Sequence, residues 1–179
     1  PRRGGIRAMA IDDDDELTGA ALSDGTCDIL LAKKGGKAIR FHENDVREMG
    51  RTARGVKGTV LEKDNEVVSM AVIVGEGGTI LSVTSNGYGK RTKIRDYRVT
   101  RRGGKGVISI KTTKRNGPVV SVKVVNDTDE VMIMTRNGVM IRLPVSDISV
   151  IGRNTQGVRV ISLGDGDHVT GVACVVSEE

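Results

Sequence analysis

The sequence predicts an all-β, propeller-like fold built from repeated four-stranded antiparallel blades. Three observations support this fold class: an internal repeat with a period of 51 residues, short runs rich in Val, Ile and Thr, and a glycine-containing turn at the same place in each unit. β-Branched residues suit pleated strands, and no segment shows the sustained helical spacing of apolar residues that an amphipathic helix needs. Four strands in a repeat of about 40–50 residues are typical of a propeller blade.

The repeat becomes visible when residues 29–41, 80–92 and 131–143 are aligned without a gap. Five columns, within and after these segments, hold the same residue in all three units: Gly36, Gly87 and Gly138; Arg40, Arg91 and Arg142; Asp45, Asp96 and Asp147; Arg51, Arg102 and Arg153; and Gly55, Gly106 and Gly157. Five matched columns in one fixed register identify a single unit that recurs along the chain.

Each unit is expected to contain four short strands. In the unit that starts at Gly55, these are residues 56–61, 66–73, 79–84 and 88–92. The last two are separated by Asn-Gly, which is typical of a hairpin with a type I′ turn and positive φ at both central residues. Gly35-Gly36 and Asn137-Gly138 supply the same turn in the neighbouring units. The chain is therefore predicted to be one domain fragment, residues 1–179, with blades at about 5–54, 55–105, 106–156 and a partial blade at 157–179.

The composition excludes several classes of protein. Hydrophobic residues make up 37% of the chain and the mean hydropathy is −0.20, as expected of a folded, soluble domain. No apolar run approaches the roughly 20 residues of a membrane helix, and no secretory signal follows Pro1, so we expect a piece of a longer cytoplasmic protein. The two cysteines and two histidines include no closely spaced pair, so no metal site is predicted. The acidic run Asp12–Glu16 lacks the spacing of a calcium loop and is interpreted as a solvated turn between the first two strands.

A basic, glycine-rich linker joins the last strand of each unit to the first strand of the next. Because these linkers occupy equivalent places, we expect them to emerge along one edge as a spaced series of positive patches. The candidate binding residues are Arg2, Arg3, Arg51, Arg54, Lys57, Arg101, Arg102, Lys105, Arg153 and Arg159. A second set of candidates lies on the predicted strands, namely Arg40, Lys90, Arg91 and Arg142. For Arg40, Arg91 and Arg142, a solvated strand end explains the residue equally well.

Duplex DNA is the partner that this charge pattern favours. The net charge is +5, and a series of Arg and Lys along a curved edge can neutralise phosphates and hold a bent duplex without reading bases. The only aromatic residues are Phe41, Tyr88 and Tyr97, and Phe41 and Tyr97 are expected in the core. That is too few for the base stacking typical of single-strand binders. The alternative is a platform for protein–protein contacts, which would show an apolar patch with a polar border.

Three longer motifs carry a resemblance to a known family. Asn86-Gly-Tyr-Gly-Lys-Arg-Thr92, Gly103-Gly-Lys-Gly-Val-Ile-Ser-Ile-Lys111 and Gly152-Arg-Asn-Thr-Gln-Gly-Val158 closely resemble the C-terminal domain of the bacterial DNA gyrase A protein, and the resemblance covers essentially the whole chain. It implies a six-bladed β-pinwheel that wraps DNA and so supports ATP-dependent negative supercoiling. It also implies partners, namely the N-terminal domains of the gyrase A protein and the gyrase B protein, and a place at the nucleoid. The related domain of the corresponding topoisomerase IV protein is the nearest alternative.

The family's signature box, Gln-Arg-Arg-Gly-Gly-Lys/Arg-Gly, is matched by Thr100-Arg-Arg-Gly-Gly-Lys-Gly106 except for Thr100 in the place of Gln. In the family the functional box belongs to the first blade, so the resemblance implies that this is a copy in a late blade. No catalytic constellation is found, and Gly87–Thr92 lacks the pattern of a phosphate-binding loop. The resemblance places the cleavage tyrosine in a separate domain and ATP on the gyrase B protein. We therefore expect a non-catalytic chain without a cofactor of its own.

Overall fold

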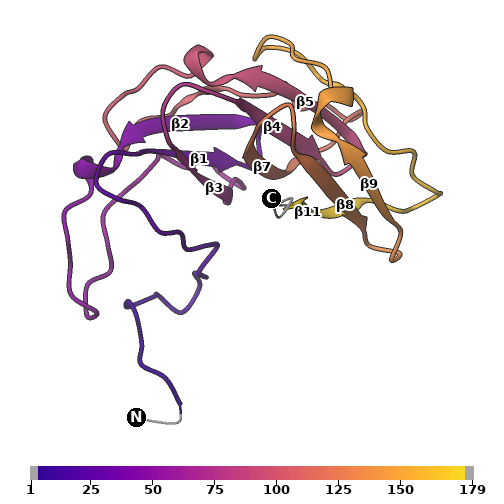
Figure 1. Ribbon diagram of the computed structural model, residues 1–179. Coiled ribbons are helices and arrows are strands. Elements are labelled where there is room, and N and C mark those ends of the chain that lie inside the picture. The colour runs from indigo at the N-terminus through magenta and orange to yellow at the C-terminus, as the bar shows by residue number, and fades with distance from the viewer. Residues whose placement is uncertain (1–3, 176–179) are drawn as a thin grey trace.

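The computed structural model describes residues 4–175, which form an arch of three antiparallel sheets (Figure 1). The described part of the chain contains strands and short 3-10 turns but no α-helix, so the predicted all-β class is confirmed. Residues 4–27 form no strand and run away from the first sheet as an extended segment. Asp12–Glu16 is exposed there and includes a turn, but it does not lie between strands.

The three sheets are built from strands whose order in space differs from their order in the chain. The first sheet has the order β3 (Val67–Ile73), β1 (Asp28–Lys33), β2 (Lys37–His42), β6 (Val107–Ile108). The second has the order β10 (Val158–Arg159), β5 (Tyr88–Lys93), β4 (Thr79–Thr84), β7 (Val119–Val125). The third has the order β11 (Val169–Val175), β8 (Glu130–Thr135), β9 (Met140–Pro144). A 3-10 turn follows each central hairpin: η1 (Glu43–Asp45), η2 (Ile94–Asp96) and η3 (Val145–Asp147).

Each complete sheet combines strands from three successive sequence units. In the first sheet the hairpin β1–β2 comes from the first unit, β3 from the second and β6 from the third. The strands of one sequence unit are therefore distributed over more than one sheet. The physical reason lies in the path of the chain. After it completes one hairpin, its next strand pairs with the hairpin before that one: β6 follows β4–β5 but pairs with β2, and β10 follows β8–β9 but pairs with β5.

This pairing with an earlier hairpin also explains why residues 56–61 form no strand. Their equivalents, β6 and β10, each pair with the hairpin that lies two units earlier in the chain. The described residues contain no hairpin before Asp28, so residues 56–61 have no such partner. Whether these residues form a strand depends on a partner that is distant in the chain, and the local sequence pattern does not reveal whether that partner is present.

The hairpin turns use glycine differently from the predicted type I′ turn. The amide of Gly87 donates to the carbonyl of Thr84 at 3.1 Å, so Ser85 and Asn86 are the central residues and Gly87 is the fourth. Gly87 has φ +79°, whereas Asn86 is not among the described residues with positive φ. The turn thus resembles a type I turn followed by a left-handed residue, which also matches the twist of a hairpin. Gly36 and Gly138 have the same bond and a similar φ.

Two apolar cores lie on either side of the second sheet. All six residues of β4 are buried, because alternate side chains of a strand point to opposite faces and both faces are covered. Ile80 packs with Leu30 and Tyr97 in one core, and Leu81 packs with Ile133 in the other. Burying a large apolar side chain stabilises the fold by about 1.5–3 kcal/mol. Phe41 and Tyr97 are buried as predicted, at 2% and 1% exposure.

Candidate nucleic-acid interface

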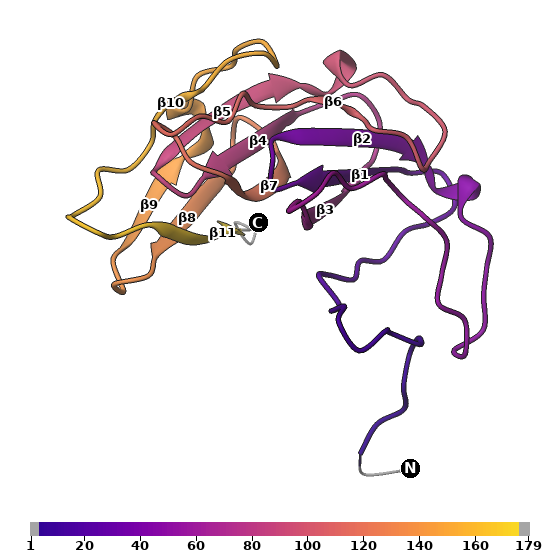
Figure 2. The same ribbon diagram turned by 180° about the vertical axis from the view of Figure 1, so that it is seen from behind.

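The basic linkers lie along the outer edges of the hairpins. After η2, Val99 forms a parallel bridge with Arg40, and β6 then pairs antiparallel with the start of β2. Residues 100–106 bulge out between these two contacts. The next linker repeats the path, because Val150 bridges Arg91 and β10 pairs with β5. The loops 100–106 and 151–157 are therefore equivalent excursions from adjacent sheets, on the side of the arch that carries β6 and β10 (Figure 2).

The last glycine of the box is required by contact within the protein. Gly106 has φ +71°, and a Cβ at this position would lie 2.3 Å from the carbonyl oxygen of Ala38. Gly157 has φ +79°, and its Cβ would lie 2.7 Å from the carbonyl oxygen of Gly89. The linker returns to the hairpin edge at this point, and a side chain would push it away. The glycine serves the fold here rather than the approach of a phosphate.

Two equivalent arginines tie each linker to the one before it. Arg102 donates through Nε to the carbonyl of Asp45 at 2.8 Å and through Nη1 to the carbonyl of Lys57 at 3.0 Å. Arg153 donates in the same way to the carbonyl of Ile108 at 2.9 Å. Lys57 and Ile108 are themselves equivalent positions of the repeat. An open groove lies between the two linkers and is lined by Gly106, Val107, Ile108, Gly152, Arg153 and Asn154, with Lys37 and Asp96.

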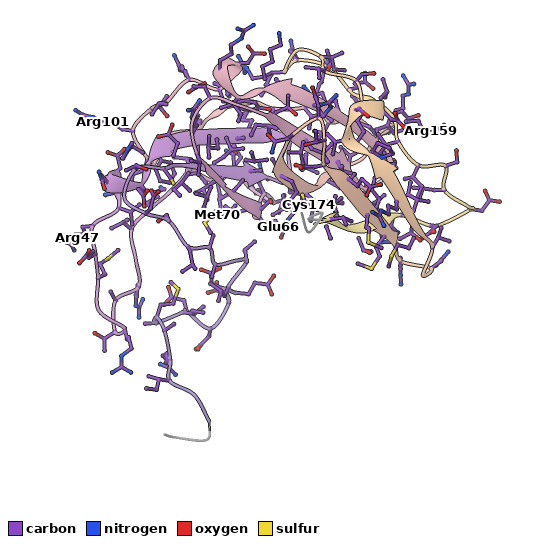
Figure 3. All side chains as sticks on the ribbon, in the orientation of Figure 1. Arg47, Glu66, Met70, Arg101, Arg159 and Cys174 are labelled. Atoms are coloured by element: carbon purple, nitrogen blue, oxygen red, sulfur yellow. The ribbon has the colours of Figure 1, made fainter. Side chains whose placement is uncertain are left out.

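Several predicted residues are exposed and remain candidates for contact with a phosphate. Arg101 and Lys105 are exposed on the box loop and form no ion pair within residues 4–175. Arg51, Lys57 and Arg159 are also exposed. Figure 3 shows Arg101 and Arg159 projecting away from the body of the arch at opposite sides of the view.

Two other predicted arginines are exposed but paired with carboxylates. Arg54 pairs with Asp12 at 2.8 Å, and Arg142 pairs with Glu130. Each keeps more than half of its side chain exposed, so neither is removed from the candidates. Arg2 and Arg3 lie outside the described residues.

Three residues of the second set are buried, which corrects their interpretation as surface residues. Arg40, Lys90 and Arg91 are 5%, 0% and 4% exposed. Arg40 donates to the carboxylate of Asp28 at 2.8 Å and to the carbonyls of Ile94 and Tyr97. Arg91 pairs with Asp127 and donates to the carbonyl of Ile148 at 2.7 Å. Both side chains hold the turn of the following unit, and their burial leaves them unavailable to a DNA backbone.

Two buried lysines, Lys90 and Lys33, donate hydrogen bonds to backbone carbonyls of the linkers. Lys90 donates to the carbonyls of Gly152 at 2.7 Å and Arg153 at 2.9 Å. Burial and, secondly, the nearby charge of Arg153 lower the pKa of Lys90 to about 8. Lys33 is fully buried and donates to the carbonyls of Val60 at 2.8 Å and Lys105 at 3.1 Å.

The role of Lys33 was missed by sequence reasoning. Its signal was a lysine at the end of the otherwise apolar run Ile29–Ala32. The carboxylate of Glu62 accompanies its ammonium at 2.8 Å. Hydrogen bonds from Lys33 and Lys37 lower the pKa of Glu62 to about 2. Lys33, at the end of β1, thus pairs with Glu62 and fixes the position of the box loop through its bond to the carbonyl of Lys105.

One group of metal-ligating side chains lies close together within residues 4–175, formed by Asp24, Cys27 and Glu43. Glu43 accepts from the amide of Cys27 at 2.6 Å, and Asp24 accepts from Thr26 and from the Cys27 thiol. Burial and the hydrogen bond to Asp24 raise the pKa of that thiol, so it stays protonated at neutral pH. These contacts close the loop before β1.

No helix in residues 4–175 is long and apolar enough to cross a membrane.

An arch of sheets that exchange strands, with cationic linkers along one edge, defines a propeller-type repeat domain. The chain belongs to the family described as DNA gyrase C-terminal domain, beta-propeller, whose model matches residues 1–24, 28–73, 78–126 and 129–175. It is 48% identical over 172 residues to the DNA gyrase A protein of Salmonella typhimurium, a match that covers 96% of this chain and 20% of the relative. It is 47% identical over 174 residues to the same protein of Staphylococcus aureus, covering 97% and 20%. The chain thus spans about a fifth of the length of these relatives.

Solved structures agree with this family. A structure of the DNA gyrase A C-terminal domain matches with a TM-score of 0.89 and 28% identity, covering 98% of this chain and 59% of that one. The C-terminal domain of DNA topoisomerase IV matches with the same TM-score and 26% identity, covering 94% and 52%. The fold alone therefore does not separate the two relatives. The family model and the sequence relatives confirm the predicted resemblance to the gyrase A protein.

Proposed function

We propose that this chain binds duplex DNA without regard to sequence along its linker edge and bends it around the arch. The observation that carries the proposal is the recurrence of cationic linker loops at equivalent places on adjacent sheets, with Arg101 and Lys105 exposed on one loop and the half-buried Arg153 on the next. Arg101 and Lys105 have no carboxylate partner within residues 4–175, so their charges are available to phosphates. Neutralising phosphates releases counterions, and this release drives binding that does not depend on sequence.

The curvature of the arch supports bending in addition to binding. The linkers emerge from successive sheets that are rotated relative to one another (Figure 1), so a duplex that contacts two of them must follow the curve. Bending 20–30 base pairs costs about 1–6 kcal/mol, which a few phosphate contacts can offset. The bend would present DNA for strand passage elsewhere in the enzyme.

We further infer the setting of this activity from the family. The chain would act as a non-catalytic part of a type II topoisomerase, with the N-terminal domains of the gyrase A protein and the gyrase B protein as partners. Its wrapping would support ATP-dependent negative supercoiling at the bacterial nucleoid, with the nucleotide on the gyrase B protein. No cofactor of its own is proposed.

The test is the affinity for a random-sequence duplex, measured by fluorescence anisotropy at several salt concentrations. The slope of log K against log[salt] should be about −0.9 for each phosphate neutralised. Replacing both Arg101 and Lys105 by Ala should make the slope shallower by about 2 and weaken all sequences alike.

The matched control removes two charges away from the linkers. Lys123 lies on β7 and Arg136 in the β8–β9 turn, so the K123A/R136A variant should keep the wild-type slope. Loss of binding to particular sequences only, or no binding at low salt, would refute the proposal. Equal losses in both double variants would show a general effect of net charge instead of a binding edge.

A further inference from the structure

Two arginines enclose one tyrosine at the turn end of β5. Arg115 donates through Nε to Tyr88 Oη at 3.2 Å, and Arg159 donates through Nη2 to the same oxygen at 3.4 Å. Their guanidinium carbons lie 5.0 Å and 5.7 Å from the centroid of the tyrosine ring. Tyr88 is buried at 6% exposure, whereas both arginines are exposed. The buried ring thus holds two exposed cations side by side.

Within residues 4–175, no carboxylate neutralises these two charges. Neither Arg115 nor Arg159 takes part in an ion pair within residues 4–175. The pKa of Tyr88 is lowered by the hydrogen bonds from Arg159 and Arg115 and by the charges of these two arginines. Two like charges held close together repel each other, so an anion that binds between them relieves the repulsion.

The equivalent corner of the first sheet is electrostatically different. Lys37 occupies the position of Tyr88, and its ammonium pairs with Glu62 at 2.7 Å. Asp64 occupies the position of Arg115. The corresponding turn near the end of the chain contains Asp165 and Asp167. The turn that carries Arg115 is therefore basic where its counterparts are acidic, and the positive corner belongs to the second sheet in particular.

The turn that carries Arg115 is fixed to the linker loop 151–157, the third basic linker of the chain. Asn116 is fully buried and donates to the carbonyls of Lys111 and Gln156, each at 3.0 Å. The hydroxyl of Thr113 donates to the side-chain oxygen of Gln156 at 3.1 Å. Because Gln156 belongs to the linker loop 151–157, the arginine pair and this loop are held in one fixed arrangement.

We propose that Arg115 and Arg159, positioned by Tyr88, form a phosphate-binding site that takes one phosphodiester of the duplex next to the third linker. The planar guanidinium presents N–H groups in a fork that matches two phosphate oxygens. The tyrosine reduces the rotamer freedom that the arginines would lose on binding. Tyr88 is a positioning residue, because its buried hydroxyl contacts the arginines and not the DNA. The inference rests on the proposed DNA binding and adds to it Arg115, which sequence reasoning did not include.

The first test compares R115A, R159A, the R115A/R159A double variant and Y88F in the salt-dependent anisotropy assay on the full chain. The double variant should make the slope shallower by about 1 and raise Kd roughly tenfold on every sequence. Y88F keeps both charges and the packed ring, so it should keep the slope and raise Kd only a few-fold. A merely structural role for Tyr88 would instead change the thermal unfolding midpoint, which should stay at the wild-type value in all four variants.

The outcomes separate this inference from the proposed function. If the wild type binds the duplex and the double variant has the same slope and Kd, the site is refuted while DNA binding stands. A shallower slope in Y88F would overturn its positioning role.

If the wild type does not bind the duplex, a second arm still tests the site. Inorganic phosphate is titrated while the arginine Nε–H signals are followed by NMR. Shifts of the Arg115 and Arg159 signals at lower phosphate concentration than that of Arg101 would support the site. Equal responses of all arginines would refute it.

Discussion

Replacing Gly106 by Ala tests whether the box glycine serves the fold. The residue has φ +71°, and an added Cβ would lie 2.3 Å from the carbonyl oxygen of Ala38 and 2.7 Å from its carbon. A left-handed backbone costs an alanine about 1–2 kcal/mol, and forcing atoms into a packed contact costs about 1–3 kcal/mol more. We expect G106A to lower the free energy of unfolding by about 2–5 kcal/mol.

Gly103 offers a matched control in the same loop. Its φ is +82°, but the nearest atom to an added Cβ, the carbonyl oxygen of Lys57, lies 3.7 Å away. G103A should therefore show the conformational cost alone, about 1–2 kcal/mol. The difference between the two variants isolates the collision with β2.

Urea unfolding at neutral pH measures both variants, with the free energies taken from the midpoints if the m-values agree. Hydrogen exchange adds a local measurement, because the amide of Ser109 donates to the carbonyl of Gly36 at 2.8 Å. This amide should exchange faster in G106A than in G103A if the collision lifts β6 from the hairpin. A G106A variant that is no less stable than G103A would refute the reasoning.

The remaining predictions concern two titrating groups beneath the linkers. The pKa of Lys90 is about 8 in the folded chain against an ordinary 10.5, so the folded state binds fewer protons than the unfolded state between these values. Its contribution to stability should therefore rise with pH across that window, and Lys90→Met should abolish this rise in urea unfolding between about pH 7.5 and 10. The pKa of Glu62 is lowered from 4.5 to about 2, so its contribution is present above pH 4.5 and is lost as the pH falls toward 2. Glu62→Gln should flatten the acid limb of the stability curve, and an unchanged limb would show that the Lys33 and Lys37 contacts do not stabilise the fold.

The box combines two kinds of residue that the motif by itself does not distinguish. Arg102 and Gly106 make contacts inside the protein, to the carbonyls of the preceding linker and to the edge of β2. Arg101 and Lys105 are exposed and have no ion pair within residues 4–175. Substituting the whole motif would therefore mix a loss of stability with a loss of phosphate contacts. The pair R101A/K105A avoids this confusion.

The candidate site was predictable where it depended on local composition. The linkers were recognisable from clustered Arg, Lys and Gly at equivalent positions, and the structure places them along hairpin edges. The second set of candidates failed because exposure of a strand depends on what covers it. Arg91 lies on β5, the second strand of its hairpin, and the chain that follows η3 covers it: Val150 forms a bridge with Arg91, and the carbonyl of Ile148 accepts from its side chain. Arg142, the equivalent residue on β9, has no linker beside it within residues 4–175 and is exposed. Arg115 was overlooked because its role depends on Tyr88, which is 27 residues away in the chain.

The sequence by itself determined the all-β class, the period of 51 residues and the positions of the three central hairpins. These features depend on residue types and spacings within one unit, since β-branched runs favour strands and glycine permits the turn. Only the tertiary structure decided which strands share a sheet, which turn type closes each hairpin and which arginines reach the solvent. Strand partners from three different units meet in one sheet, and hydrogen bonding between such distant segments leaves no local pattern. Burial follows from that pairing, so Arg40 is buried beneath the next unit whereas Arg101 is exposed on its linker.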